Sequence, residues 1–179
     1  GAMLWYPDET IQHAGIVTGL GGYAGHSHKY KKKGGSGYLF RTSTVQDFSG
    51  VTGACLLVKT AVYDEMHGLD EQFAVAFNDV DFCLRVRDAG YRIAWTPYAE
   101  LIHYESKSRG GDEKDPVKAA RFAAEQQRLY TIHGKENILD DPYYNPNLTR
   151  DREDFSESDD LRRLKEGRVT VRFRGGTLQ

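Results

Sequence analysis

One part of the chain alternates short apolar segments of strand length with helices that stop at glycine. Residues 51–58, VTGACLLV, are typical of a short buried strand, and TAVYDEMHG predicts a helix with Thr60 as its N-cap and Gly68 just past its end. FNDVDFCLRVRDA predicts a second helix that stops at Gly90, and YRIAWTP alternates like an edge or half-buried strand until Pro97 breaks it. This alternation predicts an α/β fold, with a mixed β-sheet and flanking helices.

The flanking segments add further elements to this α/β pattern. Residues 4–17 are typical of a strand pair or β-hairpin around an Asp-Glu turn. DPVKAARFAAEQQRLYTIHG is the clearest helix, because Asp115 is a good N-cap, Pro116 suits the first helical position and Gly134 ends it. Residues 151–168 carry mostly charge and predict a solvated helix or partial disorder, with one late strand within VTVRF.

Composition argues against several classes of protein. The chain has 179 residues, enough for one substantial core, and its 24 basic and 26 acidic residues give no overall attraction to nucleic acid. No apolar run approaches the roughly 20 residues that a membrane-spanning helix requires. Cys55 and Cys83 each lie in an apolar run, as reduced cysteines do, which favours a reducing, cytoplasmic setting.

A glycine-rich segment follows the predicted hairpin. Residues 19–24, GLGGYA, match the dinucleotide-binding pattern only formally, because histidines and lysines follow where a helix should begin. We therefore expect a loop, either flexible or closing over a ligand. His26 and His28 fit surface histidines better than zinc ligands, since a third ligand is missing. Lys29 and the lysines at 31–33 suit a diphosphate or a lipid head group, but such a run is usually just solvated.

The sequence NDVD at the start of the second helix carries the sharpest functional signal. If the helix begins near Val80, Asp79 lies at or beside the N-cap, where free backbone N–H groups and the helix dipole favour an ionised carboxylate, an available base. A purely structural alternative has Asp79 as a cap and Asp81 paired with Arg85 on the exposed face. The two aspartates also form a D-x-D pair, which matches a divalent-metal pattern.

Several motifs together resemble the C-terminal half of a family 2 glycosyltransferase, an inverting enzyme with the GT-A, nucleotide-diphospho-sugar transferase-like fold. They are GACLLVKT, GLDEQF, NDVDFCLRVRDAGYRIAWTP and ELIHYES, and the resemblance covers roughly residues 4–150. In that family the motif usually reads Glu-Asp, then x-Asp-Leu-x-x-Arg, a Gly-Tyr pair, a Pro and a later His. The corresponding positions are Asn78, Asp79, Asp81, Phe82, Arg85, Gly90, Tyr91, Pro97 and His103.

The resemblance implies a role for each member of the expected reaction centre. Asp79 would be the general base that deprotonates the acceptor hydroxyl. Gly53 and Ala54 would lie in a loop near the donor sugar. His103 would complete the coordination of a Mg²⁺ or Mn²⁺ ion bound to the nucleotide diphosphate.

Three further residues on the acceptor side follow from the same resemblance. Asp81 and Arg85 would stabilise the helix or contact the acceptor rather than bind a metal. Asn78 replaces the usual glutamate, which leaves the base in place but removes a neighbouring charge. The implied partners are a nucleotide-sugar donor and a glycan or lipid-linked acceptor, met in the cytoplasm or at the inner face of the membrane.

The nucleotide-binding half of that family has no counterpart in the sequence. We expect residues 1–3 to be a protease-cleavage scar, 4–150 the acceptor and base side of a catalytic domain, and 151–179 a charged tail or linker. The parent enzyme would build a polysaccharide or O-antigen-type glycan of the cell envelope. The isolated chain should neither bind a nucleotide sugar normally nor turn over alone, and an uncovered sheet edge should make it self-associate.

Two other functions remain open at this point. In the first, the chain is a non-catalytic protein-interaction module, NDVD is only a cap, and the glycine-rich loop and the charged tail contact a partner. The second, less favoured, is a metal-dependent hydrolase that uses Asp79, Asp81 and His103. It predicts tight binding of a divalent ion by the chain itself.

Overall fold

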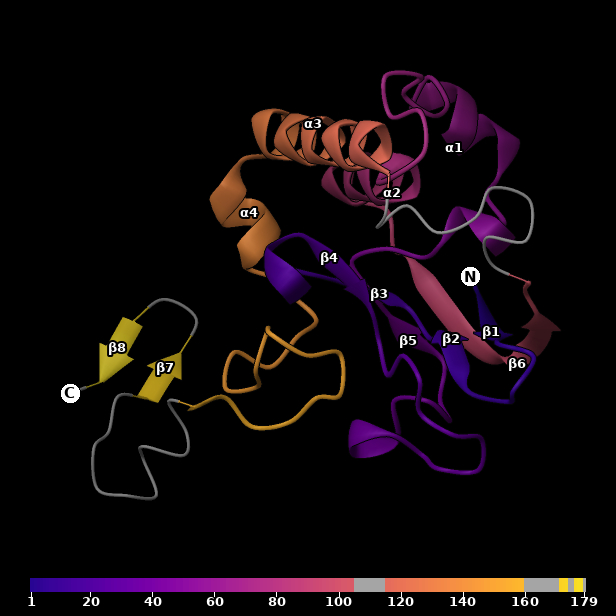
Figure 1. Ribbon diagram of the computed structural model, residues 1–179, viewed down its shortest axis with the longest axis vertical. Coiled ribbons are helices and arrows are strands. Elements are labelled where there is room, and N and C mark those ends of the chain that lie inside the picture. The colour runs from indigo at the N-terminus through magenta and orange to yellow at the C-terminus, as the bar shows by residue number, and fades with distance from the viewer. Residues whose placement is uncertain (105–114, 160–170, 174–175, 179) are drawn as a thin grey trace.

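The computed structural model describes residues 1–104, 115–159, 171–173 and 176–178. Its architecture is mixed α/β, as predicted, with the helices gathered along one side of a curled sheet (Figure 1). The main sheet contains, in spatial order, β2 (Ile11–His13), β1 (Ala2–Trp5), β6 (Ala94–Ile102) and β5 (Gln46–Asp47).

β1 and β2 form the antiparallel hairpin predicted for residues 4–17. The first strand begins earlier than expected, and the side chains of Ala2 and Met3 are only 4% and 2% exposed. Met3 contributes to the core, so the first residues take part in the fold, and their origin as a cleavage scar stays a prediction. β1 also pairs in parallel with β6, and this pairing makes the sheet mixed.

β6 is longer than the predicted strand. It continues to Ile102 and passes through Pro97, where we expected a break. Thr96 pairs with Ala2, whereas the next residue of β1 pairs with Glu100, so the register shifts across Pro97. A bulge of this kind leaves the proline outside the ladder, where its missing N–H is not needed.

A second, two-stranded antiparallel sheet consists of β3 (Ile16–Thr18) and β4 (Ala24–His26). The expectation of a loop throughout residues 19–37 is therefore wrong at β4. Gly19, with φ of 82°, makes the turn that brings β4 back onto β3. A 3₁₀ turn, η1 (Leu20–Gly22), lies between the strands, where a dinucleotide fingerprint would need a longer helix.

Residues 51–58 do not form the predicted strand. They contain a single 3₁₀ turn, η3 (Gly53–Cys55). From Thr52 onward, three successive N–H groups bond to side chains rather than to a neighbouring strand. Part of the apolar run still serves the core, since Val51 is 3% exposed, but Leu57 is 94% exposed.

The helices of the described residues are α1 (Thr60–Glu65), α2 (Asn78–Asp88), α3 (Pro116–His133) and α4 (Lys135–Leu139). α3 has the predicted ends: the Asp115 carboxylate accepts a hydrogen bond from the Val117 N–H at 2.9 Å, and Gly134 follows its last residue. α1 differs at its start. Thr60 is already helical, and Lys59 takes the N-cap position without a side-chain bond.

α2 lies at the centre of the core and is buried on two faces. Phe82 and Val86 pack with side chains of the main sheet. Val80 and Leu84 pack in a second cluster with Leu129 of α3. Because both faces are buried, the position of α2 is fixed relative to the sheet and to α3.

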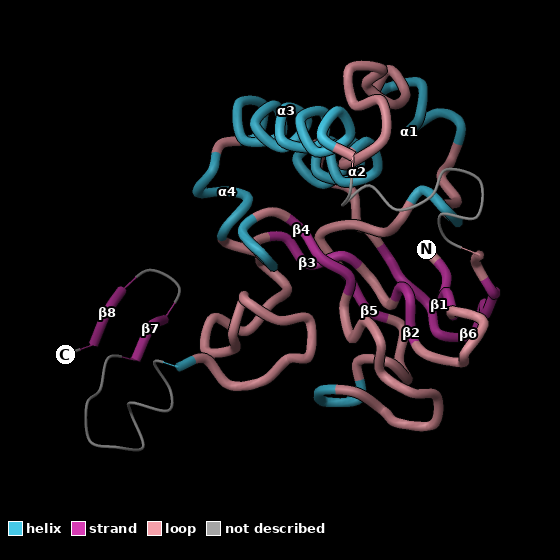
Figure 2. Tube along the Cα trace, in the orientation of Figure 1, coloured by secondary structure: helices cyan, strands magenta, loops and turns pink. Residues whose placement is uncertain are grey.

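The charged C-terminal segment is described only in part. Residues 151–159 form turns and loops around the buried Phe155, whereas residues 160–168 of the predicted helix or disordered segment lie outside the described residues (Figure 2). β7 (Val171–Phe173) confirms the late strand and pairs with β8 (Gly176–Leu178). Among the described helices, none has the length and apolar character needed to cross a membrane.

Candidate functional site

The candidate site lies at the start of α2. Phe77 precedes the helix in a left-handed conformation, with φ of 63° and ψ of 4°, and Asn78 is the first helical residue. The helix thus begins earlier than the predicted Val80, and Asp79 lies in the first turn rather than at the N-cap. Its Oδ1 accepts a hydrogen bond from the Val80 N–H at 2.8 Å, which satisfies one of the free N–H groups of the helix start.

A loop made of Thr52, Gly53 and Ala54 contacts this helix start. The Gly53 N–H donates to Oδ2 of Asp79 at 2.8 Å. On either side of it, the Thr52 N–H donates to Nε2 of His13 and the Ala54 N–H donates to Oγ1 of Thr52, both at 3.3 Å. Gly53 and Ala54 are exposed, and Asp79 is half-buried. The structure therefore brings three residues predicted for the site into one solvent-accessible place.

Glu125 of α3 fixes the segment that leads into α2. Its side chain is 4% exposed, and its two oxygens accept hydrogen bonds from the N–H groups of Val75 at 3.1 Å and Ala76 at 2.8 Å. The ring of Phe77, the next residue, lies 5.1 Å from that of Phe122 on the same helix. α3 thereby determines where α2 begins.

Asp81 is the buried centre of a polar network. Arg85 donates from Nε and Nη2 to Oδ2 of Asp81 at 2.9 and 2.7 Å, and Nε2 of His133 lies 2.8 Å from Oδ1. Burial opposes ionisation of Asp81, but the hydrogen bonds from His133 and Arg85 outweigh it and lower the pKa of this carboxyl. Arg85 also donates to the carbonyls of Met66 and Gly68, so the network joins α2 to α3 and to the segment after α1.

The expected pairing of Asp81 with Arg85 is confirmed, but its place on an exposed face is wrong, since Asp81 is 1% exposed. This burial favours a helix-stabilising role for the pair, and contact of either residue with substrate stays a prediction. Asn78 is half-buried, and its Oδ1 accepts a hydrogen bond from the Asp79 N–H at 2.7 Å. It therefore lies beside the candidate base.

His103 follows β6 and is held by Gln12 of β2. Its Nδ1 lies 2.7 Å from Oε1 of Gln12, and its carbonyl accepts from Nε2 of Gln12 at 3.2 Å. Because an amide oxygen only accepts, Nδ1 carries a proton, and in the neutral imidazole the lone pair is then on Nε2, an arrangement typical of metal-binding histidines. Within the described ranges, no three His, Cys, Asp or Glu side chains gather into a metal site. The trio of the hydrolase hypothesis, Asp79, Asp81 and His103, is accordingly not assembled there.

The histidines of the glycine-rich segment are not the surface residues that we expected. His28 is 2% exposed and accepts on Nε2 from the Tyr38 N–H at 2.9 Å, and His26 is half-buried with its Nδ1 2.9 Å from Nδ1 of His13. Burial lowers the pKa of His28 to about 4 and that of His13 well below its usual value. The lysines at 31–33 are exposed, and Lys33 is not merely solvated, because it pairs with Glu100 at 3.1 Å.

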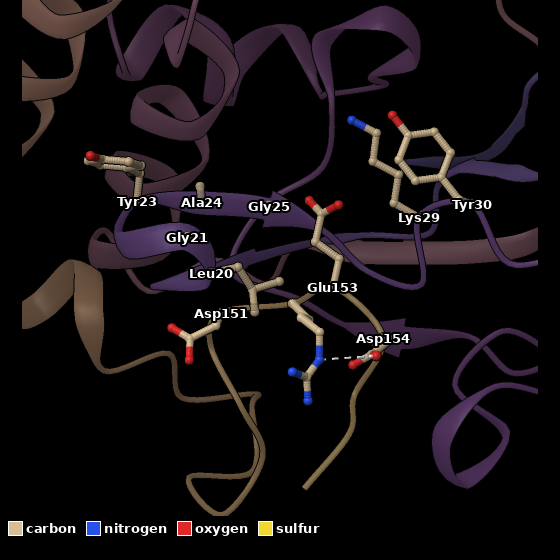
Figure 3. Close-up of a pocket in the computed structure, with 11 residues that line it drawn as sticks. Leu20, Gly21, Tyr23, Ala24, Gly25, Lys29, Tyr30, Asp151, Glu153 and Asp154 are labelled. Carbon is tan, nitrogen blue, oxygen red and sulfur yellow. Dashed lines mark ion pairs between the residues drawn. The ribbon is translucent and has the colours of Figure 1, made fainter. Parts of the chain in front are cut away.

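A separate hollow lies between the glycine-rich segment and residues 151–154 (Figure 3). It has a volume of about 410 Å³, and none of its lining residues belongs to α2 or η3. Glu153 extends across it, and its Oε1 accepts from the His26 N–H at 2.9 Å, while Arg152 pairs with Asp154 at 3.4 Å. The bond of Glu153 ties the wall of the hollow to β4.

Three buried polar residues near the site were not anticipated from the sequence: His13, Glu125 and His133. They bond to Thr52, to the segment at Val75 and to Asp81, across 39, 50 and 52 positions of the chain. Sequence patterns report mainly local structure, so such contacts are not visible in them. The sequence held one signal for the burial of Glu125. Glu125 precedes Leu129 by four residues, so the two share the face of α3 that is buried.

Comparison with curated proteins finds relatives over much of the chain. It is 49% identical over 156 residues to the uncharacterized protein y4gI of Sinorhizobium fredii, which is 87% of this chain and 17% of that protein. It is 35% identical over 150 residues, 83% of the chain, to the O-antigen biosynthesis protein RfbC of Myxococcus xanthus, of which this is 11%. It is also 32% identical over 80 residues to the N-acetylglucosaminyl-diphospho-decaprenol L-rhamnosyltransferase of Mycobacterium tuberculosis, which is 45% of this chain and 24% of that protein.

The chain therefore spans between 11% and 24% of the length of these relatives. No protein-family model and no solved structure matches it. The names of the second and third relatives suggest a glycosyltransferase family and a place in polysaccharide synthesis.

Proposed function

We propose that this chain forms the acceptor and base side of an inverting family 2 glycosyltransferase with the GT-A fold. The whole protein would move a sugar from a nucleotide diphosphate to a glycan or lipid-linked acceptor, in polysaccharide or O-antigen-type synthesis at the inner face of the membrane. The names of two relatives support the reaction class, and the mixed α/β architecture is compatible with the fold.

The contact between Asp79 and the exposed loop at Gly53 carries this proposal. A general base must lie where a substrate can reach it and must hold its carboxylate in one orientation. Asp79 is half-buried, and the N–H groups of Gly53 and Val80 each hold one of its oxygens at 2.8 Å. Each oxygen retains further acceptor capacity for the hydroxyl of an acceptor.

Inverting transfer at this site would be a single displacement. The acceptor oxygen attacks the anomeric carbon from the side opposite the nucleotide, and the bond from that carbon to the diphosphate oxygen breaks as the glycosidic bond forms. The hydroxyl proton passes to the carboxylate of Asp79. Gly53 and Ala54, which are exposed beside it, would face the donor sugar, and Asn78 would face the acceptor.

One described residue, His103, is suited to bind a divalent cation. His103 keeps a lone pair on Nε2 because Gln12 fixes the ring proton on Nδ1, so His103 would hold the Mg²⁺ or Mn²⁺ of the family. Such an ion, when bound, stabilises the charge that develops on the leaving diphosphate. The contribution of this chain to that step is the orientation of the imidazole by Gln12.

The proposal is tested by Asp79→Asn in the complete gene product. Asparagine keeps the size and the acceptor oxygen of the side chain but does not take up a proton, so the transfer rate should fall by about 10²- to 10⁴-fold. Transfer is measured as release of nucleoside diphosphate together with sugar incorporated into acceptor. Circular dichroism and thermal unfolding check that the variant still folds.

Asp88→Asn at the other end of α2 is the matched control. Asp88 is 63% exposed, and among the described residues its ion pair is with the neighbouring Arg87 at 3.7 Å, so its loss should leave transfer unchanged. Equal activity of Asp79→Asn and Asp88→Asn would remove Asp79 from the role of base.

A further inference from the structure

The loop at 52–54 is held in place by three side-chain acceptors, one for each successive N–H. Two of these acceptors belong to the candidate site itself, namely Oγ1 of Thr52 within the loop and Oδ2 of Asp79. The third is Nε2 of His13, which comes from β2 in the main sheet and accepts from the Thr52 N–H at 3.3 Å. The loop is therefore fixed from the sheet on one side and from α2 on the other.

The contacts of His13 determine which of its nitrogens carries the proton. A backbone N–H only donates, so Nε2 of His13 must be the unprotonated acceptor toward Thr52. The proton is then on Nδ1, which lies 2.9 Å from Nδ1 of His26 and donates to it. His26 is fixed in turn, because its N–H donates to Oε1 of Glu153 at 2.9 Å.

His13 is also held rigidly in this orientation. Its side chain is completely buried, and its ring meets that of His26 edge to face, with the centroids 5.0 Å apart at 83°. Burial, with smaller effects from His26 and the N-terminal ammonium, lowers the pKa of His13, so the ring is neutral at neutral pH. A protonated ring would have no acceptor to offer to Thr52.

We propose that His13 is a positioning residue for the transfer reaction, which sets the loop at 52–54 through Thr52 and thereby holds the Gly53 N–H against the carboxylate of Asp79. This inference rests on the proposed function, in which Asp79 is the base. His13 itself touches neither substrate nor the reacting atoms. Its effect is to keep the Asp79 carboxylate in one orientation, and small misplacements of a catalytic group can lower a rate by about 10²-fold.

Two substitutions at His13 separate the contact with Thr52 from the contact with His26. Glutamine places its amide oxygen about where Nε2 of the imidazole lies, so His13→Gln keeps an acceptor for the Thr52 N–H. Asparagine reaches only to the position of Nδ1, so His13→Asn keeps a donor for His26 and loses the acceptor. Both variants exchange the ring for a buried amide, and each keeps one of the two contacts and loses the other.

The first readout is hydrogen exchange of backbone amides, measured by NMR on the chain itself. In His13→Asn, exchange of the Thr52 and Gly53 amides should accelerate at least about tenfold, and in His13→Gln it should stay within about threefold of the unaltered chain. The second readout is transfer by the complete gene product. His13→Asn should lower kcat by about tenfold or more with little change in KM, and His13→Gln should restore most of it.

His28→Gln is the control for the general effect of replacing a buried histidine. His28 is as buried as His13 and also accepts on Nε2 from a backbone N–H, that of Tyr38, but it has no contact with the loop at 52–54. Its replacement should leave the Gly53 amide and kcat unchanged. If His13→Asn and His13→Gln behave alike, or if the Gly53 amide does not respond to His13→Asn, the inference is wrong.

The unaltered chain gives a test that does not depend on the folding of any variant. The ¹⁵N shifts of the His13 ring should show a protonated Nδ1 and an unprotonated Nε2, and the opposite tautomer would overturn the inference. The test is also independent of the proposed function. If Asp79→Asn retains transfer, the assignment of the base fails, and the amide exchange and the tautomer still decide whether His13 sets the loop.

Discussion

At the scale of single residues, His28 shows how the fold depends on a neutral imidazole. Its Nε2 accepts from the Tyr38 N–H, so its Nδ1–H donates to Oγ of Ser27 at 2.7 Å. Its ring stacks on Phe155 with the centroids 4.2 Å apart. Protonation would break the bond to Tyr38 and place a charge in a buried site, and burial accordingly lowers the pKa of His28 to about 4.

The stability of the chain should therefore depend on pH between about 6.5 and about 4. Above pH 6.5 His28 is neutral in both states, and its contribution is fully present. As the pH falls below 6.5, His28 becomes protonated in the unfolded chain but stays neutral in the folded chain until about pH 4, so the free energy of unfolding decreases across this window. For a pKa lowered from 6.5 to about 4, the loss reaches about 3 kcal/mol. Urea unfolding at several pH values measures it.

His28→Gln serves as the reference for this dependence. The variant should be less stable at pH 7 and should lose less stability than the unaltered chain on going to pH 4.5. Buried His13 acts in the same direction, so the remaining slope should not be zero. The carboxyl of Asp81, whose pKa lies below 3.8, contributes only at lower pH. Equal slopes for the two proteins would contradict the assignment to His28.

At the scale of elements, α3 positions the start of α2 through the side chain of Glu125. Glu125→Ala would leave the partly buried N–H groups of Val75 and Ala76 without their acceptors, and a lost hydrogen bond to a charged group costs about 1.5–3 kcal/mol. We expect the free energy of unfolding to fall by about 2 kcal/mol or more, measured by urea unfolding. The exposed Gln127 on the same helix gives the control, since Gln127→Ala should change it by less than about 0.5 kcal/mol. A loss no larger than that of the control would show that Glu125 does not hold this segment.

The elements that the sequence predicted well are those whose signals are local. α3 has an N-cap aspartate, a proline at its first position and a terminal glycine, and all three lie where the sequence placed them. The predicted strand at 51–58 failed for the opposite reason. Its apolar composition is compatible with a strand, but side chains of His13 and Asp79, 39 and 26 positions away, bond to its N–H groups and hold a turn there.

In the candidate site, too, some features could be predicted from the sequence and others could not. The structure places Asp79 against the loop at Gly53, and the roles that the family resemblance implied for these residues stay predictions. Composition and spacing alone left a structural cap as the simpler interpretation. Residues that support the site from a distance, such as His13 and Glu125, were missed because their partners lie in other elements. The burial of Asp81 was also not predictable, because a charge at i,i+4 from an arginine is usually solvated.

At the scale of the whole molecule, one side of β6 has no partner strand among the described residues for most of its length. β5 pairs with β6 only at Ala94 and Trp95, and along the remaining residues of β6 no described strand lies on that side. Tyr98, Leu101 and Ile102 in this part are 78%, 49% and 58% exposed. Unpaired N–H and C=O groups beside exposed apolar side chains are a template for pairing with another strand.

We therefore expect the chain to self-associate through this part of β6. Sedimentation velocity should show a sedimentation coefficient that rises with protein concentration, and Ile102→Lys should suppress the rise, because a charge on an edge strand disfavours pairing with a second copy. Val117→Lys is the control: Val117 is 78% exposed, but it lies on α3, so its replacement should leave association unchanged. A monomer at every concentration, or equal effects of the two substitutions, would mean that this side of β6 does not pair between copies.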